Sequence, residues 1–390
     1  MANGEAITPE DGIPGATVVC EGARIVWVGP ERDLPAEYER AETVDADGGF
    51  ILPGLIDLHL HGSGGWGVMD ASPEGLRSLS LYLAGCGTTA WLATTMTASP
   101  GRLAQVAQAV GEYEPLQGGA ELLGLHLEGP YVSREKCGAQ PATDIRPYDP
   151  EEVTRLQELA KGSLRLVTLA PEVKGNDGAV ADLRRRGVIV ALGHTNADYA
   201  TASQAMDAGA SRLTHTFNAM RGLGHREPGT VGAASDRAGV VVEVIADGVH
   251  VHPACLRLLY RAFGPARVNL VTDALPFAGL APGLYNWDGT PVTATADALY
   301  LADGTLAGSR LTLAGAVAFM VKECGVALVD AVRMASLTPA ESLGIADRKG
   351  SLTPGKEADL VILDRDLNVR WCAVRGRVVA MPTLRAWQLS

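Results

Sequence analysis

The sequence lacks long apolar runs, an excess of positive charge and closely paired cysteines, and each absence excludes a class of protein. No apolar run approaches the roughly 20 residues that a membrane-spanning helix requires, so we expect no membrane partner. The 33 Lys and Arg residues against 45 Asp and Glu give a formal net charge of −12, which argues against a nucleic-acid partner. The six cysteines form no CxxC pair, which argues against a disulfide framework or a zinc ribbon.

What is present is an apolar chain that can bury a large core. Of its 390 residues, 47% are hydrophobic and 20% are charged, a composition too apolar for a disordered chain. The length fits one large core plus a small module. The opening MANGEAITPEDG lacks the basic start and the apolar stretch of a secretory signal, so we expect a cytoplasmic protein.

Eight β-rich segments recur along the chain, and most are followed by stretches with helical spacing. Strand and helix alternating eight times predict an α/β fold, namely a (β/α)8 barrel over residues 51–347. The predicted strands are 54–61, 88–95, 122–129, 164–171, 188–195, 212–219, 240–247 and 268–274.

The two ends of the chain have a different pattern. ATVVCEGARIVWVG near the N-terminus predicts a hairpin with Glu21 and Gly22 in the turn region. The C-terminal stretch from GSLTPGKEADLVILD onward again alternates short strands with turn residues. We therefore expect residues 1–50 and 348–390 to pair into a small β-sandwich domain.

Reactive side chains gather at the C-terminal ends of the predicted strands, where barrel enzymes place their active sites. His59 and His61 end the first strand and point to the same side, because strand side chains repeat every two residues. Later strand ends carry Glu128, His194, His215 and Asp273. Imidazoles and carboxylates that converge on a barrel mouth suit a divalent metal such as zinc. His126 fits a structural histidine that packs below such a site.

Eight motifs occur in a fixed order along the chain: LPGLIDLHLHGSGG, GLHLEGPYVS, LGHTNA, THTFNAM, REPG, ADGVHV, VTDALPFAG and TLAGS. Together they resemble the N-acetylglucosamine-6-phosphate deacetylase family of the amidohydrolase superfamily. HLEGP, THTFNAM and ADGVH are specific to that resemblance, whereas LPGLIDLHLHG and PGKEADLVILD are typical of the whole superfamily.

The resemblance implies a role for individual residues. Glu128, His194 and His215 match the metal ligands of the family. Asp273 matches its catalytic acid and base. Arg226 and His250 would contact the phosphate of the substrate. The other implied substrate-binding residues are Ala139, Gln140, Asn218, Ala219, Leu306, Ala307 and Gly308.

The resemblance also implies a divalent cofactor, for which we expect zinc, with Fe2+, Mn2+ or Co2+ as alternatives. Some family members lack the HxH histidines and use one metal, whereas His59 and His61 are both present here. Whether a second ion, bridged by Glu128, is bound therefore stays open. Gln140, beside Cys137, stands where the family often has histidine; glutamine can hydrogen-bond a sugar hydroxyl but cannot carry positive charge.

The implied reaction converts N-acetylglucosamine 6-phosphate into glucosamine 6-phosphate and acetate. An unstrained amide is a poor electrophile, and a metal that polarises its carbonyl and activates water addresses this problem. Asp273 would take the proton of the water and hand it to the departing nitrogen, and His194 as the base is the less favoured alternative. Rival substrates are the galactosamine or mannosamine epimers. A rival of another class is a non-catalytic scaffold on the same fold.

The substrate's phosphate requires a locally positive site. A sugar phosphate carries about −1.5 to −2 charges at neutral pH, and the chain as a whole would repel it. The metal, Arg226 and His250 would supply positive charge. In the family the equivalent arginine can reach across a dimer interface, so we expect a homodimer in which Arg226 can complete the site of its partner.

Overall fold

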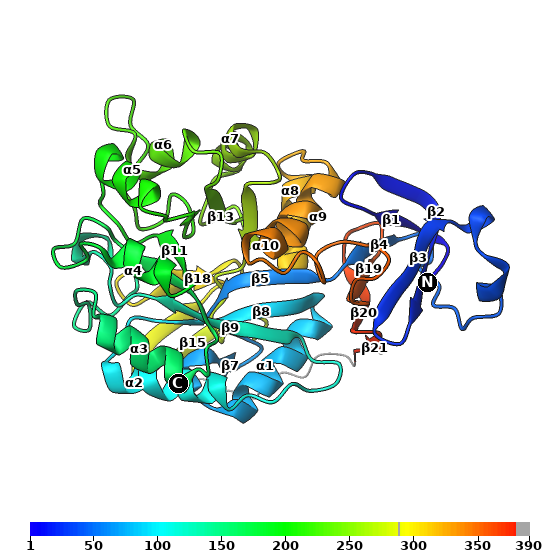
Figure 1. Cartoon of the computed structure of the whole chain (residues 1–390), viewed down its shortest axis with the longest axis horizontal. Helices are drawn as coiled ribbons and strands as arrows, with labels where there is room; N and C mark the ends of the chain where they lie inside the picture. Colours follow the sequence, from blue (N-terminus) through cyan, green and yellow to red (C-terminus); the bar gives the residue numbers. More distant parts are fainter. Residues whose placement is uncertain (288, 380–390) are drawn as a thin grey trace.

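The computed structural model describes residues 1–287 and 289–379, which form a barrel with a small sheet beside it (Figure 1). Eight parallel strands lie in chain order around the barrel, from β5 to β14, with helices outside them, as the sequence predicted. These strands are β5 (Leu55–Leu60), β8 (Thr88–Thr95), β9 (Glu121–Glu128), β10 (Leu164–Leu169), β11 (Ile189–Leu192), β12 (Arg212–Leu213), β13 (Val241–Ile245) and β14 (Val268–Val271).

Several helices begin at a short polar cap. Ser72, Ser99 and Asp149 each accept a hydrogen bond from a backbone N–H of the first turn, and a proline follows each of them. Proline lacks the N–H that would be unpaired at this position, so it favours a helix start there. The helices are α1 (Pro73–Gly85), α2 (Pro100–Gly111), α3 (Pro150–Leu159), α4 (Ala179–Arg185), α5 (Tyr199–Asp207), α6 (Gly229–Ser235), α7 (Pro253–Phe263), α8 (Leu313–Lys322), α9 (Leu328–Ala335) and α10 (Leu337–Ser342).

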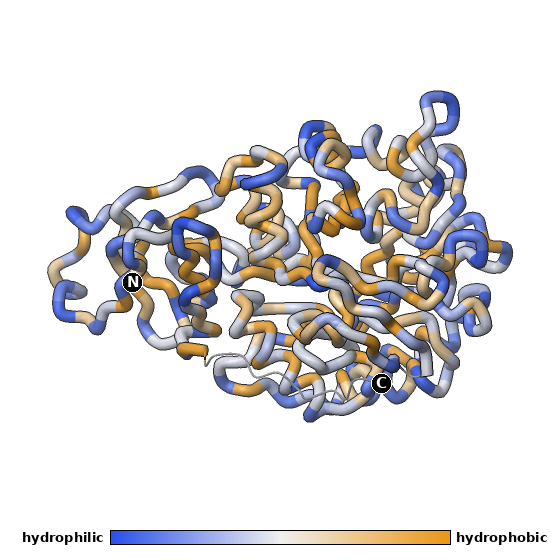
Figure 2. The backbone as a smooth tube through the Cα atoms, turned by 180° about the vertical axis from the view of Figure 1, so that it is seen from behind, coloured by the Kyte–Doolittle hydropathy of each residue, from blue (hydrophilic) through white to orange (hydrophobic). Residues whose placement is uncertain are grey.

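The strands and helices share one large apolar core. Figure 2 shows hydrophobic residues along the inner elements and hydrophilic residues at many of the outer loops. Trp91 on β8 is fully buried, and its indole N–H donates to the Ser80 hydroxyl of α1 at 3.1 Å. Within the described residues, the longest apolar helix falls short of what a membrane crossing needs.

The barrel closes where the last strand meets the first. The backbone N–H of Asp273 donates to the carbonyl of His59 at 2.9 Å, and the N–H of His61 donates to that of Ala274 at 2.9 Å. Asp57, fully buried on β5, accepts a hydrogen bond from the Thr272 hydroxyl at 2.6 Å. This closure brings residues more than 200 positions apart into contact and places Asp273 beside the two histidines of β5.

Strands from both ends of the chain share one seven-stranded sheet, in the order β21-β20-β19-β4-β1-β2-β3. This agrees with the predicted small β domain. The exact domain limits stay a prediction: β4 crosses the proposed limit at residue 50, and 380–390 lie outside the described residues. The strands are β1 (Gly4–Ile7), β2 (Gly12–Glu21), β3 (Arg24–Pro30), β4 (Phe50–Pro53), β19 (Leu360–Leu363), β20 (Val369–Val374) and β21 (Arg377–Val378).

Two small antiparallel elements near the barrel mouth were not predicted. A four-stranded sheet lies between β14 and α8, and its Asp303-Gly304 pair makes a turn of the kind that favours hairpins. The other element is a two-stranded hairpin after β5. The strands are β6 (Gly62–Ser63), β7 (Trp66–Gly67), β15 (Gly283–Trp287), β16 (Thr290–Ala294), β17 (Ala298–Leu301) and β18 (Leu306–Ser309).

A buried lysine joins the barrel to the small sheet. Lys349 is 2% exposed, and its ammonium lies 2.9 Å from Glu121 at the start of β9 and 2.8 Å from Glu357. It also donates to Asp359, just before β19. Burial works against the charged ammonium, but the surrounding carboxylates outweigh burial and raise the pKa of Lys349. The lysine therefore stays charged at the junction.

Replacing this lysine is expected to destabilise the protein strongly. Lys349→Met leaves the buried Asp359 without its cation and leaves Glu121 and Glu357 with Arg348 alone, so we expect the free energy of unfolding to fall by about 3 to 5 kcal/mol. Chemical denaturation monitored by circular dichroism measures the change. The exposed Lys174 is the matched control, and Lys174→Met should change stability by no more than about 0.5 kcal/mol. A similar small loss for both variants would contradict the assigned role of Lys349.

Candidate metal centre and active site

The side chains selected from the sequence meet at the C-terminal ends of the barrel strands. Glu128 is the last residue of β9, and His59 lies on β5. His61 directly follows β5, and the other three stand two residues after the end of a strand: His194 after β11, His215 after β12 and Asp273 after β14. All six are buried or nearly so, although they come from five strands spread around the barrel.

One group of donor atoms surrounds a single point. The Nε2 atoms of His194 and His215 lie 3.2 and 3.0 Å from Glu128 Oε1 and 3.0 Å from each other. Zinc bonds of about 2.0 to 2.1 Å at tetrahedral angles would place such donors about 3.3 Å apart. His194 Nδ1 lies 2.8 Å from the Lys136 carbonyl, which can only accept, so Nε2 keeps its lone pair. The three residues therefore fit a divalent cation.

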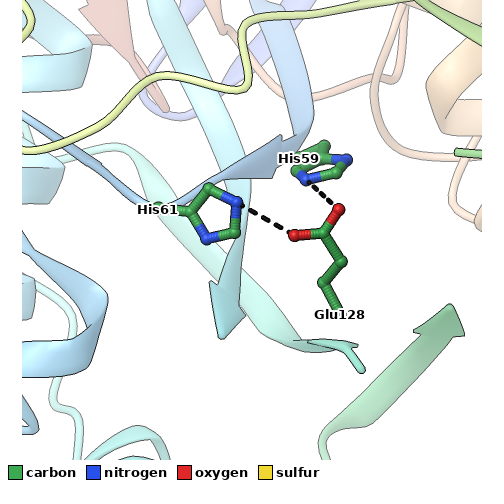
Figure 3. A group of neighbouring side chains, drawn as sticks. All are labelled: His59, His61 and Glu128. Carbon is green, nitrogen blue, oxygen red and sulfur yellow. Dashed lines mark ion pairs between the residues drawn. The ribbon is translucent and has the colours of Figure 1, made fainter. Parts of the chain in front are cut away.

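A second group shares the same glutamate (Figure 3). His61 Nε2 lies 3.2 Å from Glu128 Oε2, and His59 Nε2 lies 3.4 Å from Glu128 Oε1. Asp273 Oδ1 lies 3.2 Å from His61 and 3.5 Å from His59. His59 Nε2 is buried and forms no hydrogen bond within the described residues. This unsatisfied nitrogen and its carboxylate neighbours fit a second cation bridged by Glu128.

The electrostatics keep both carboxylates ionised. Burial alone would raise the pKa of Glu128, but protonated imidazoles, through the charge of His59 and hydrogen bonds from His194 and His215, hold its pKa well below the ordinary value, and a cation held in place of those protons would act in the same direction. The pKa of Asp273 is also lowered, because His59 and His61 outweigh its burial. A carboxylate at Asp273 is the form that can accept a proton.

The backbone at these positions is strained. Among the described residues, eleven other than glycine have positive φ, and five of them lie at the site. Such conformations cost about 1 to 3 kcal/mol each and persist only where the surrounding structure enforces them, often at active sites. The five are His194 (φ 46°), His215 (27°), Phe217 (79°), Ala219 (46°) and Asp273 (49°).

A cavity of about 240 Å³ opens above the two groups, and most of the residues expected to bind substrate line it. The β15–β18 sheet delivers one wall, because Ser309 N–H donates to the Asp273 carbonyl at 3.0 Å. At Gly308 a Cβ would meet that same carbonyl at 2.9 Å, so the close approach requires glycine. The lining residues expected from the sequence are Ala139, Gln140, Asn218, Ala219, His250, Leu306, Ala307 and Gly308.

Arg226 differs from the other expected residues. It is exposed and does not line this cavity in its own chain. His250 lines the cavity and is oriented by Asp247, whose carboxylate lies 2.6 Å from His250 Nδ1. The second nitrogen of His250 is thereby left for a ligand. Asp247 was not selected from the sequence, although it stands in the ADGVH motif.

Gln140 also has a contact that the sequence did not predict. Its side-chain N–H donates to Glu128 Oε2 at 2.7 Å, and its oxygen accepts from Thr97 N–H at 2.6 Å. The glutamine therefore orients the shared ligand as well as lining the cavity. Cys137, in the same loop, is partly exposed. Met96, Gly138 and Thr305 line the cavity too and were missed, because an apolar side chain, a glycine or a single threonine does not by itself signal ligand contact.

His126 lies below the site, as expected. Its Nε2 lies 2.8 Å from the Thr168 hydroxyl and its Nδ1 lies 3.3 Å from that of Thr94. Burial, together with the charge of His59, lowers the pKa of His126 to about 3. The ring is therefore neutral and serves the packing of the barrel interior.

Comparison with known proteins places these features in a family. Residues 50–381 match the amidohydrolase family. An N-acetylglucosamine-6-phosphate deacetylase of Bacillus subtilis is 40% identical over 95% of this chain and 94% of that protein. An N-acetylgalactosamine-6-phosphate deacetylase of Escherichia coli O157:H7 is 39% identical over 86% of this chain and 89% of that protein. The structure of a mutant N-acetyl-D-glucosamine-6-phosphate deacetylase of Mycobacterium smegmatis, in complex with N-acetyl-D-glucosamine-6-phosphate, has a TM-score of 0.89 at 34% identity and covers 96% of this chain and 97% of that chain.

A parallel barrel whose strand ends gather imidazoles and carboxylates defines a class of metal-dependent hydrolases, and the donor groups support a divalent metal. The chain belongs to the amidohydrolase family and, within it, to the N-acetylglucosamine-6-phosphate deacetylases.

Proposed function

We propose that this chain hydrolyses the acetamide of N-acetyl-D-glucosamine 6-phosphate, giving D-glucosamine 6-phosphate and acetate, with zinc as its metal. The observation that carries the proposal is the convergence of Glu128, His194 and His215 around one point, with Asp273 beside them on the floor of the cavity. The substrates printed for the related proteins support the sugar and the phosphate.

The residues would share the work as follows. Glu128, His194 and His215 would hold the cation, which when bound would supply polarisation of the amide carbonyl and activation of water. Asp273 accepts a proton from the attacking water as the new C–O bond forms. It then delivers this proton to the sugar nitrogen as the C–N bond breaks, so one carboxylate serves both transfers. The products are acetate and the free amine.

The other end of the substrate would meet positive charge. His250 lines the cavity and presents one ring nitrogen, while Asp247 holds the other. Arg226 lies outside the cavity of its own chain, which supports a homodimer in which the arginine binds the phosphate in the site of the partner. The main chain at Asn218 and Ala219 and the part of β18 from Leu306 to Gly308 would enclose the sugar. We also propose a cytoplasmic location, in keeping with the sequence.

One alternative substrate has specific support. The Escherichia coli O157:H7 relative, named for the galactosamine epimer, is 39% identical, close to the value for the Bacillus subtilis relative. Identity alone therefore does not separate the epimers. The two sugars differ in the orientation of one hydroxyl, and a polar group placed for one orientation is left unpaired by the other.

An acetate-release assay on purified protein of known metal content tests the proposal. The panel holds the 6-phosphates of N-acetylglucosamine, N-acetylgalactosamine and N-acetylmannosamine, together with unphosphorylated N-acetylglucosamine. We expect the highest kcat/KM with N-acetylglucosamine 6-phosphate, loss of activity after chelation and recovery with Zn2+. A higher kcat/KM for the galactosamine phosphate would favour the alternative, and no acetate release from any member would favour a non-catalytic scaffold.

A further inference from the structure

A buried ion pair lies directly beneath His59 in the barrel interior. Glu243 on β13 and Arg212 on β12 are 0% and 1% exposed. Glu243 Oε2 lies 3.2 Å from His59 Nδ1, on the side of the ring that faces away from Glu128 and Asp273. A buried ion pair is costly to desolvate, so it is weak evidence for stability. Its position against one ring nitrogen points to another role.

The hydrogen bonds of the pair assign each oxygen of Glu243 to a different neighbour. Arg212 Nε and Nη2 both donate to Glu243 Oε1, at 3.2 and 3.0 Å. The guanidinium also donates to Asn269 and Ser342, each at 2.5 Å. Oε2 is therefore left for His59. Arginine can only donate, so it fixes which way the carboxylate faces.

The proton on His59 follows from this arrangement. A carboxylate at Nδ1 holds one ring proton there, so Nε2, which faces Glu128 and Asp273, is the nitrogen left to bind a cation. This Nε2 atom is fully buried and forms no hydrogen bond within the described residues. Its carboxylate neighbours can only accept when ionised. Without a cation, a proton on Nε2 would face the two carboxylates, and a bound cation would take the place of that proton.

We propose that Glu243, held by Arg212, is a positioning residue: it keeps a proton of His59 on Nδ1, so that Nε2 is available to the second cation group described above, formed by His59, His61, Glu128 and Asp273. The inference rests on the proposed metal-dependent function. It adds that the Glu243–Arg212 pair decides whether the chain binds one ion or two. His61 does not depend on this pair, because its Nδ1 lies 3.2 Å from the Thr94 carbonyl. The ion held by Glu128, His194 and His215 does not depend on it either.

Glu243→Gln reverses the groups that face His59. Arg212 donates only, so the amide oxygen must turn toward it and the amide N–H groups must turn toward His59. The His59 proton then moves to Nε2, where it blocks a cation. We expect wild type to bind two Cd2+ or Zn2+ ions per chain and the variant to bind the second ion about 10- to 100-fold more weakly. Calorimetric titration and 113Cd NMR, with two resonances in wild type, measure this directly.

Ser342→Ala is the matched control, because it removes one hydrogen bond of the same arginine and leaves Glu243 and His59 unchanged. It should keep both ions. Loss of the second ion in this control as well would show a general structural effect and overturn the proposal. An unchanged second affinity in Glu243→Gln would overturn it too, as would a single ion in wild type.

A measurement on wild type keeps the proposal testable if Glu243→Gln does not fold. In 15N-labelled protein loaded with 113Cd2+, His59 Nε2 should couple to cadmium while Nδ1 carries the proton. Cadmium coupling at Nδ1, or at neither nitrogen of His59, would overturn the proposal. Failure of the proposed function would give a different result from failure of this proposal. In that case wild type would also lack the ion of Glu128, His194 and His215, which is the ion that His215→Ala removes.

Discussion

Asp273→Asn is expected to lower kcat by about 10²- to 10⁴-fold while the ion at Glu128, His194 and His215 stays bound. Asparagine keeps the size of the side chain but cannot accept the proton of the attacking water. Asp273 is not among the ligands of this ion. The Nε2 atoms of His194 and His215 lie within 3.2 Å of Glu128 Oε1 without it, so the ion should remain. Steady-state acetate release and metal analysis of the same preparation measure the two effects.

The comparison of kcat with binding separates proton transfer from a loss of structure. Substrate affinity measured by calorimetry should change little, because the pocket walls from Gln140 and Leu306 remain. Asp297→Asn is the matched control, because Asp297 is exposed on the inserted sheet and its replacement should leave turnover unchanged. Near-normal turnover in Asp273→Asn would show that another group moves the proton, with His194 as the next candidate.

Arg226→Ala is expected to lower kcat/KM for the phosphorylated sugar by about 10- to 100-fold, mainly through KM, and to leave the unphosphorylated sugar nearly unchanged. A hydrogen bond to a charged group contributes about 1.5 to 3 kcal/mol, and this variant loses such contacts with the phosphate. The two substrates compared in one assay isolate the phosphate. Arg40, exposed near the small sheet, gives a control variant with the same change in net charge. Equal losses for both sugars would remove the phosphate role from Arg226.

A mixing experiment tests whether Arg226 acts across a dimer. Arg226→Ala and Asp273→Asn chains are each impaired, but a mixed dimer contains one site with an intact Asp273 and an Arg226 from the partner. We therefore expect activity to rise when the two variants are unfolded together and refolded as a mixture. If the arginine acts within its own chain, each site in the mixture lacks one of the two groups and activity will not rise.

The sequence alone determined where the barrel strands lie and which polar residues stand at their ends. Buried parallel strands produce apolar runs, and a histidine or carboxylate at the end of such a run is conspicuous. His59, His61, Glu128, His194, His215 and Asp273 were found for this reason. Because parallel strands of a barrel end on the same face, their convergence followed from the fold class without any knowledge of contacts.

The inserted sheet could not be predicted in the same way. The segment 283–309 contains turn pairs such as Asp303-Gly304, but short antiparallel strands between two barrel elements have no period that separates them from a loop. Their role became visible only where Ser309 hydrogen-bonds to Asp273 and brings Leu306 to the pocket wall.

Tertiary structure alone decided which partner each polar side chain has. Glu243 interrupts an apolar run, yet only barrel packing sets one oxygen against Arg212 and the other against His59, 184 residues away in the chain. Gln140 likewise meets Glu128 because its loop folds back over the strand ends. A hydrogen bond requires that donor and acceptor be placed to within a few tenths of an ångström, whereas sequence periodicity specifies only which face of a strand a residue occupies. The sequence therefore determines which residue types stand at the site, and the closed barrel sets their protonation and orientation.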